Sequence, residues 1–320
     1  MKKLHSLGER VYDTYDVESY YGEEELRFLK KRLPLRVLSE SDFAAWQRQG
    51  YVVIKQAVSR RQALATYHAM LDFAGLDPDN PAQWNDFPDF PTQQHKDLHV
   101  IGMIECYHHR TLWENRQTQR VYDAFVDIWD THDLWVTLDR INLNPPNTGT
   151  RAINPFIHWD IDTTLTPLPQ RVQGILVLND NSQQQGGFQC VPTLYQEFDK
   201  WVSHQPDNRD RYVPELSAHH AIVVPEVQAG DLLIFNGLLP HGIAANRTRH
   251  QIRAVQYLSM MPAVYAADKV LADRLLSYQT LSTPTWDASL VGDPVLHEQQ
   301  RYRSPALSAL GQRLLGAQPW

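Results

Sequence analysis

The sequence is poor in the features that mark secreted, membrane-spanning and nucleic-acid-binding proteins. It has only two cysteines, Cys106 and Cys190, too few for a disulfide framework. It has no run of about 18 apolar residues, so we expect no membrane-spanning helix. The formal net charge is −7 with the histidines neutral, so the protein as a whole is not attracted to nucleic acid or to an anionic membrane.

A targeting signal is also lacking at the start of the chain. The first residues, Met1 to Ser6, include two lysines, but no apolar stretch follows them, so we expect no signal peptide. With 42% hydrophobic and 21% charged residues, the composition is that of an ordered globular protein. We therefore expect a soluble, cytoplasmic protein that binds neither nucleic acid nor membrane. The sequence does not indicate the oligomeric state.

Short β-prone segments separated by turns fill the second half of the chain. They do not alternate with helices as the strands of a parallel sheet do, so the pattern predicts an antiparallel sandwich or jelly roll. Acidic residues followed by basic ones predict a surface helix over Glu23–Leu33. We expect one domain over residues 1–320, consisting of a helical extension, helices that cover the sheet, the β core, and a C-terminal helix and tail (1–38, 39–133, 134–262 and 263–320).

The segment Phe156–Asp160 contains the residues that point most directly to chemistry. We predict it as a strand, on which His158 and Asp160 share one face while Trp159 points to the other. A histidine and a carboxylate are two of the three ligands in the facial triad of non-heme Fe(II) oxygenases, which leaves three metal positions open. Taken alone, the pair could equally be a buried histidine hydrogen-bonded to a carboxylate.

Two later residues would complete such a site. His241 lies between Pro240 and Gly242, after an apolar strand, and a jelly roll pairs strands that are far apart in the sequence. Arg253 lies in a β-branched and apolar strand, where an unpaired buried charge is costly and a fixed guanidinium suits bidentate binding of a carboxylate. The order His158, Asp160, His241, Arg253 therefore indicates a metal site followed by an anion anchor.

Other histidine clusters and carboxylates are weaker candidates. Asp162 is four residues from His158, and of the two acids only Asp160, two residues away, is spaced to share a ligand site with His158 on a strand. No suitably spaced carboxylate or second cysteine completes a zinc site in the cluster His95, His99, Cys106, His108 and His109, and we interpret its histidines as solvated. We interpret His219 and His220 as surface residues.

The ordered set of residues resembles the phytanoyl-CoA dioxygenase family of Fe(II)- and 2-oxoglutarate-dependent oxygenases. The resemblance covers roughly residues 40 to 262. It includes His158-x-Asp160, His241 and Arg253, and also three shorter stretches: Gly50-Tyr51-Val52-Val53, Asn179-Asp180 to Gly186-Gly187, and Val191-Pro192-Thr193. After Pro192 the family usually has Gly-Ser-His, where this chain has Thr193-Leu194-Tyr195.

The resemblance implies a mainly β fold, a double-stranded β-helix of the cupin-like jelly-roll type with flanking helices. It implies that His158, Asp160 and His241 bind Fe(II), and that Arg253 binds the distal carboxylate of the co-substrate 2-oxoglutarate. Oxygen (O2) would complete the reaction, with release of succinate and CO2. Related halogenases have a small residue in place of the carboxylate, so the presence of Asp160 favours hydroxylation over halogenation. By its resemblance to this family, we expect the substrate to be a small molecule or secondary metabolite.

Further site residues are predicted from their position near this core. Asn142 and Gln173 lie on neighbouring predicted strands and are candidates to contact 2-oxoglutarate. Trp159 and Arg151 are candidates for the substrate pocket, and Arg140 could meet an acidic group of the substrate.

Several functions remain open from the sequence. Desaturation, epoxidation or cyclisation could occur at the same iron site, and the chain could be a non-catalytic relative that binds a metal or a small acid. A metal-dependent hydrolase or isomerase on a cupin-like barrel is a third possibility.

Overall fold

The structure is a computed structural model that describes residues 24–80, 84, 102–147, 156–263, 268–285, 290, 292–293 and 295–320. Its helical segments are η2 (Leu26–Phe28), α2 (Glu40–Gln49), α3 (Arg60–Ala74), α5 (Arg110–Arg116), α6 (Gln119–Trp129), α7 (Pro192–Gln196), α8 (Phe198–Ser203), α9 (Asp268–Thr280), α10 (His297–Arg301) and α11 (Ala309–Leu315). Its strands are β1 (Tyr51–Ile54), β2 (Met103–Ile104), β3 (Leu134–Val136), β4 (Ile141–Asn144), β5 (Val172–Val177), β6 (Phe188–Cys190), β7 (Leu232–Asn236), β8 (His241–Ile243), β9 (Arg253–Tyr257) and β10 (Met260–Pro262).

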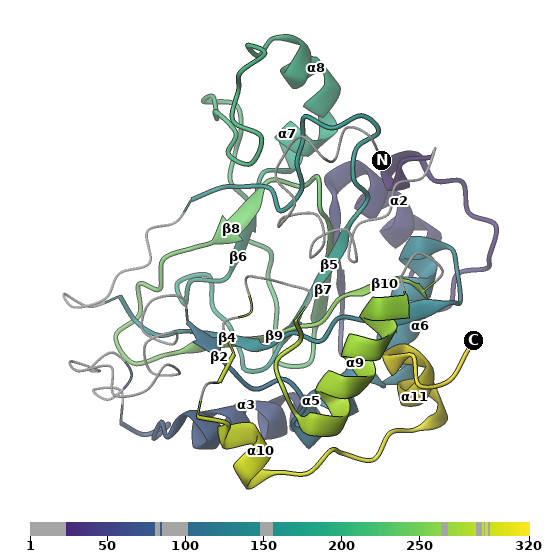
Figure 1. The fold of residues 1–320 in the computed structure, drawn as a ribbon. Helices are drawn as coiled ribbons and strands as arrows, with labels where there is room; N and C mark the ends of the chain where they lie inside the picture. Colours follow the sequence, from purple (N-terminus) through teal and green to yellow (C-terminus); the bar gives the residue numbers. More distant parts are fainter. Residues whose placement is uncertain are drawn as a thin grey trace.

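An antiparallel sheet of six strands, in the order β1-β7-β5-β9-β4-β2, organises the molecule. Two smaller antiparallel pairs accompany it, β6 with β8 and β10 with β3. Strands from distant parts of the chain lie side by side, as in β5, whose neighbours are β7 and β9 (Figure 1). This is the antiparallel arrangement that the sequence predicts.

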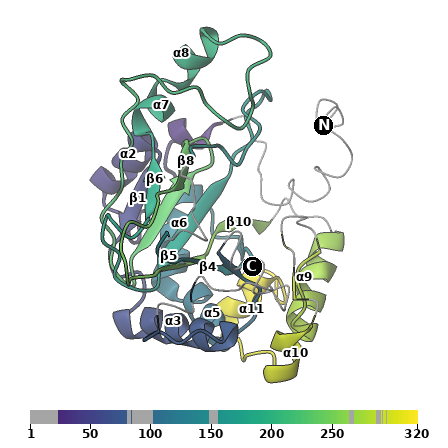
Figure 2. The same cartoon turned by 90° about the vertical axis from the view of Figure 1, so that its left-hand side faces the viewer.

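The two faces of the large sheet bury different cores. Successive residues of β7 alternate between them, so Leu232 and Ile234 belong to one cluster and Leu233 and Phe235 to the other. The first cluster lies against helices α2, α3, α5 and α6, and the second lies between the large sheet and β6. In the turned view α3 and α5 lie together at one end of the sheet, away from α7 and α8 (Figure 2). The second face is the one that bears the candidate site.

The helices that cover the sheet have the local signals expected of their ends. Ser39 and Asp42 form a capping box at the start of α2, and Ser59 caps α3. Each helix ends at a glycine in the left-handed conformation, Gly50 with φ 80° and Gly75 with φ 68°. These ends agree with the sequence signals and fix where β1 begins directly after α2.

The helix predicted over Glu23–Leu33 is wrong for the described part of that segment, which contains only the short η2. Two carboxylates near the end of α6 bind the backbone N–H groups that a helix would use. Asp130 accepts from Arg32 and Leu33, and Asp127 accepts from residues 36–38. Because these buried carboxylates satisfy the backbone donors, the segment stays extended along α6. The carboxylates that prevent a helix here lie far along the chain, so the charge pattern of the segment itself does not reveal them.

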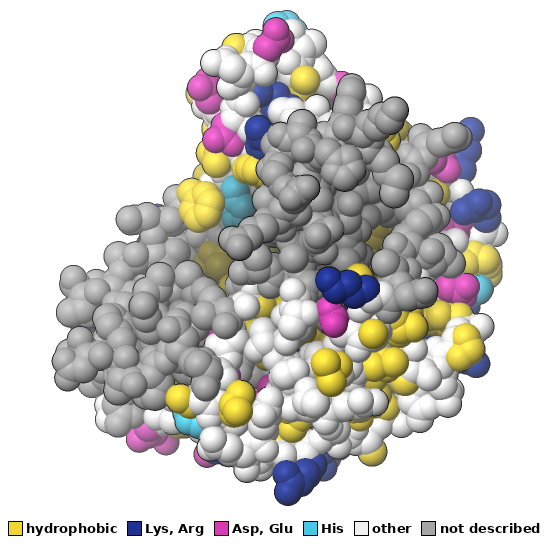
Figure 3. All heavy atoms as spheres, viewed as in Figure 1, with side chains coloured by type: hydrophobic (Ala, Val, Ile, Leu, Met, Phe, Trp, Pro, Cys, Tyr) yellow, Lys and Arg dark blue, Asp and Glu magenta, His cyan; other side chains and the backbone are white. Residues whose placement is uncertain are grey.

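The described surface does not gather charge of one sign on the face drawn in Figure 3, where basic and acidic side chains are scattered among apolar ones. Among the described residues, no helix combines the length and apolar character needed to cross a bilayer.

Candidate metal centre

His241 is the first residue of β8, and its neighbour Gly242 allows another segment to approach closely. A Cβ atom on Gly242 would lie 2.1 Å from the backbone oxygen of Phe156, which is far too close for any side chain. The segment before His158 can therefore lie directly against β8 only because residue 242 is glycine. This close approach explains in physical terms why a glycine follows His241.

His158 and His241 are paired through their backbones. His158 donates its N–H to the oxygen of His241 at 2.9 Å, and His241 donates to the oxygen of His158 at the same distance. The predicted strand Phe156–Asp160 is reduced to this single bridge, since Asp160 lies in a bend. The convergence of His158 and Asp160 is therefore correct, whereas a regular strand is not its cause.

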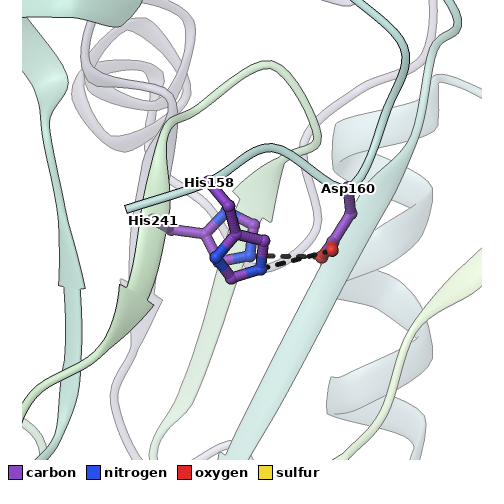
Figure 4. A group of neighbouring side chains, drawn as sticks. All are labelled: His158, Asp160 and His241. Atoms are coloured by element: carbon purple, nitrogen blue, oxygen red, sulfur yellow. Dashed lines mark ion pairs between the residues drawn. The ribbon is translucent and has the colours of Figure 1, made fainter. Parts of the chain in front are cut away.

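The three side chains point toward one another (Figure 4). Asp160 Oδ1 lies 3.4 Å from His158 Nε2, and Asp160 Oδ2 lies 3.2 Å from His241 Nε2. Atoms bound to one ion at about 2.1 Å lie about 3.0 to 3.4 Å apart, whereas N–H···O hydrogen bonds centre near 2.9 Å. The spacing of this cluster therefore matches ligands placed around a metal better than a hydrogen-bonded pair.

The protonation of these groups also suits a cation. Burial acts to raise the pKa of Asp160, but the adjacent imidazoles of His158 and His241 outweigh it and hold that pKa well below its usual range. The carboxylate is therefore ionised. His241 Nδ1 lies 2.9 Å from the oxygen of Leu239, and an N–H donated there leaves Nε2 as the free lone pair. Two imidazoles and a carboxylate are a donor set that non-heme Fe(II) accepts.

A cavity of about 310 Å³ is lined by these three residues and by residues of the large sheet. Its apolar walls include Phe188, Phe235 and Ile243, and Arg253 belongs to the same lining. Arg253 is 1% exposed. Burial lowers its pKa from the ordinary value, partly offset by Tyr257.

Arg253 has a neutral partner but lacks a full set of bonds. Its Nη1 donates to Asn142 Oδ1 at 2.6 Å, and its buried Nε has no hydrogen-bond partner. Among the described residues, no carboxylate forms an ion pair with it. A buried guanidinium in this state is a receptor for an anion that enters the cavity.

The other predicted site residues make contacts that the sequence does not predict. Asn142 binds Arg253, as described, and Gln173 Nε2 donates to Asp160 Oδ2 at 2.7 Å. Trp159, expected at the rim of the substrate pocket, is instead 1% exposed, donates to the oxygen of Leu238, and packs against Trp201. It is therefore a core residue.

Two arginines and one further carboxylate were also candidates for the site. Arg140 lines the cavity but its Nη1 is bonded to the buried Glu105 at 2.7 Å. Arg151 lies outside the described residues. Asp162, the alternative to Asp160, accepts from Thr164 and Arg211 and is not part of the triad.

The interpretation of His219 and His220 as surface residues is wrong for His220, whose side chain is 2% exposed. Both Nε2 atoms contact Glu197 Oε1, at 2.6 Å from His219 and 2.8 Å from His220. These are hydrogen-bond lengths, and the Ser217 N–H donates to His220 Nδ1, which places the proton of that ring on Nε2. This cluster is thus complete without a metal, in contrast to the triad.

The interpretation of His108 as solvated is wrong, because its side chain is fully buried, as is that of Cys106. His108 Nε2 lies 2.8 Å from Ser277 Oγ. His109 is half-buried and its Nδ1 accepts the Thr111 N–H as the N-cap of α5. His95 and His99 lie outside the described residues. The described members of this cluster therefore have structural roles.

Comparison with known proteins gives a family. A profile of the phytanoyl-CoA dioxygenase (PhyH) family matches residues 46–255. A curated relative, "Ava biosynthesis cluster protein O" of Aspergillus versicolor, is 24% identical over 259 residues, which are 73% of this chain and 81% of that protein.

Solved structures give the fold. A putative oxidoreductase from Salmonella typhimurium LT2 superposes with a TM-score of 0.61 at 18% identity, covering 87% of this chain and 83% of that one. EctD from S. alaskensis with 2-oxoglutarate and 5-hydroxyectoine has a TM-score of 0.51 at 17% identity, covering 91% and 89%. At these identities the likeness concerns the fold, and it confirms the predicted cupin-like jelly-roll core.

Proposed function

This chain belongs to the phytanoyl-CoA dioxygenase family, and we propose that it is a hydroxylase. It is accordingly an oxidoreductase, a dioxygenase that uses Fe(II) and 2-oxoglutarate. We propose further that His158, Asp160 and His241 bind the iron and that the substrate is a small molecule.

The observation that supports this site best is the metal-like spacing of three side chains at one end of a cavity. The same cavity contains a buried guanidinium whose Nε lacks a partner. A dianion with carboxylates at both ends, such as 2-oxoglutarate, meets both requirements. One end would meet the cation held by the triad, and the other would meet Arg253 in a charge-assisted, bidentate contact.

Residues around Arg253 prepare it for this contact. Asn142 holds Nη1 from the neighbouring strand β4, so the guanidinium keeps one orientation before the co-substrate arrives. Phe188 and Phe235 lie beside the ring of His241, with centroids 5.7 and 4.5 Å away. These rings exclude water from that side of the site, which strengthens electrostatic contacts inside it.

Bound iron, together with 2-oxoglutarate and O2, supplies the oxidising power for inserting oxygen into a C–H bond. One oxygen atom of O2 ends in the hydroxyl group of the product and the other in succinate, and the lost carboxylate leaves as CO2. Asp160 occupies the carboxylate position, which leaves no ligand position for a halide in its place and favours hydroxylation. The curated relative is named for a biosynthesis cluster, which supports a secondary-metabolite substrate.

Anaerobic titration of the purified protein with Fe(II) and 2-oxoglutarate tests the site. We expect a visible charge-transfer band, followed by succinate on exposure to air, and a product with one added oxygen when the substrate is supplied from a metabolite library. His241→Ala should abolish the band, while His250→Ala, which changes an exposed histidine, should preserve it. Absence of the band in the wild type would overturn the proposal, and metal binding without any succinate would indicate a non-catalytic relative.

A further inference from the structure

Asp160 is held by a residue that is not one of the three proposed ligands. Gln173 Nε2 donates to Asp160 Oδ2 at 2.7 Å, shorter than the 3.2 Å that separates the same oxygen from His241 Nε2. Gln173 therefore makes the shortest of these contacts with the carboxylate.

The backbone of Gln173 is fixed by the large sheet. It lies on β5, opposite Phe235 of β7, and shares a face with Ile175 and Val177. Those two residues belong to the apolar cluster between the sheets, so Gln173 is the polar member of an otherwise apolar row. A polar side chain at this point is best explained by the carboxylate that it contacts.

The orientation of the amide follows from the same contact. If the amide were turned over, Oε1 would face Oδ2, and two acceptors would oppose each other at hydrogen-bond distance. The NH2 group must therefore face Asp160. Oε1 is then on the other side, buried and without a hydrogen-bond partner. Leaving a buried carbonyl unsatisfied costs roughly 1–3 kcal/mol, so the bond to Asp160 is kept at the expense of local stability.

We propose that Gln173 is a positioning residue that fixes the plane of the Asp160 carboxylate. Its N–H occupies one lone pair of Oδ2, so the carboxylate cannot turn to offer both oxygens equally to a metal. Bidentate binding would consume a coordination position that the co-substrate or oxygen needs. This role rests on the proposed metal site, and it explains why a polar residue interrupts the apolar face of β5.

Replacing Gln173 tests the proposal by iron binding and spectroscopy. Gln173→Leu keeps a similar volume and removes the donor, whereas Gln173→Asn keeps the amide on a shorter side chain. We expect Gln173→Leu to weaken Fe(II) binding about 10–100-fold, the range for partners that orient metal ligands, and to shift the anaerobic Fe(II)–2-oxoglutarate band. Gln173→Asn should lie between the leucine variant and the wild type.

Ile175→Val is the matched control, because it alters packing on the same face of the same strand without a polar contact. It should leave the iron dissociation constant and the band unchanged. Wild-type affinity and an unshifted band in Gln173→Leu would overturn the role of Gln173 while leaving the metal site intact. A wild type that lacks the band would instead remove the site itself. If the leucine variant fails to fold, the iron affinity and the band of the asparagine variant decide the role of Gln173 instead.

Discussion

His158 and His241 exchange both of their backbone hydrogen bonds, at 2.9 Å each. The two histidines are thus opposed residues of an antiparallel bridge, and their side chains are neighbours because their backbones are paired. Their ring centroids lie 4.7 Å apart. Most of the candidate metal site is therefore set by backbone geometry before any ion binds.

The bridge depends on Gly242, so Gly242→Ala should damage the fold and the site together. A methyl group there meets the Phe156 oxygen, and the two segments must separate. We expect a loss of about 2 kcal/mol or more in the free energy of unfolding, together with weaker iron binding. Denaturant unfolding and metal titration measure the two effects. Ile243→Val on the same strand, which deletes one methyl group, should cost about 1 kcal/mol and keep iron affinity, and equal behaviour of both variants would contradict this account.

Arg253→Lys should weaken 2-oxoglutarate binding without changing iron binding. Lysine keeps the positive charge but lacks the planar fork that binds a carboxylate through two parallel bonds. We expect the dissociation constant for 2-oxoglutarate to rise at least about tenfold, an effect of about 1.4 kcal/mol. Isothermal titration with the iron-loaded protein measures it. Unchanged 2-oxoglutarate affinity would show that the anion binds elsewhere.

Asn142→Leu tests whether Asn142 orients Arg253 rather than the co-substrate. Removing the Oδ1 acceptor leaves Nη1 of a buried guanidinium without its 2.6 Å partner. We expect weaker 2-oxoglutarate binding, smaller in effect than that of the Arg253→Lys variant, and a non-additive double variant because both act through one group. Fully additive losses in the double-mutant cycle would indicate that Asn142 contacts the ligand independently.

His109 predicts a pH dependence of stability away from the site. Burial, and then the neighbouring Arg110 and Arg301, lower its pKa to about 4. The unfolded state binds its proton near the ordinary value of about 6.5, so it holds more protons than the folded state between these values. Stability therefore falls as the pH drops from about 6.5 through 4, by up to about 3 kcal/mol from this residue.

The structural reason is the N-cap of α5, because a proton on His109 Nδ1 removes the acceptor of the Thr111 N–H. His109→Asn keeps a cap acceptor that does not titrate, so it should lose this part of the pH dependence. Unfolding free energies of both proteins at pH 7 and pH 4.5 give the comparison. An identical loss in the two proteins would contradict the assignment.

The sequence predicted the strands before His241 and around Arg253 because those signals are local. The apolar run before His241 and the alternation around Arg253 are visible within a few residues. The pairing of His158 with His241 is not local, because it depends on the register between segments far apart in the chain. The sequence therefore predicted that His158 and Asp160 converge, but attributed it to a strand that the structure reduces to a bridge.

The misplaced residues show the same limit. Trp159 alternates with the ligands as predicted, but only the fold shows that Leu238 accepts its indole N–H in the core. Gln173 and Asn142 lie near the site as expected, yet each contacts a side chain of the site, which requires the tertiary structure to recognise. The boundaries of the single domain stay a prediction.

Successive residues of strand β9 face opposite sides of the sheet, and the two sides affect different properties, stability and ligand binding. Ala254 faces the cluster under the helices, while Arg253 and Tyr257 face the cavity. Enlarging Ala254 would thus disturb folding without entering the cavity, whereas changes at its neighbours would alter ligand choice. An evolving or engineered enzyme could vary specificity along one edge of this strand while its thermal stability is set by the other.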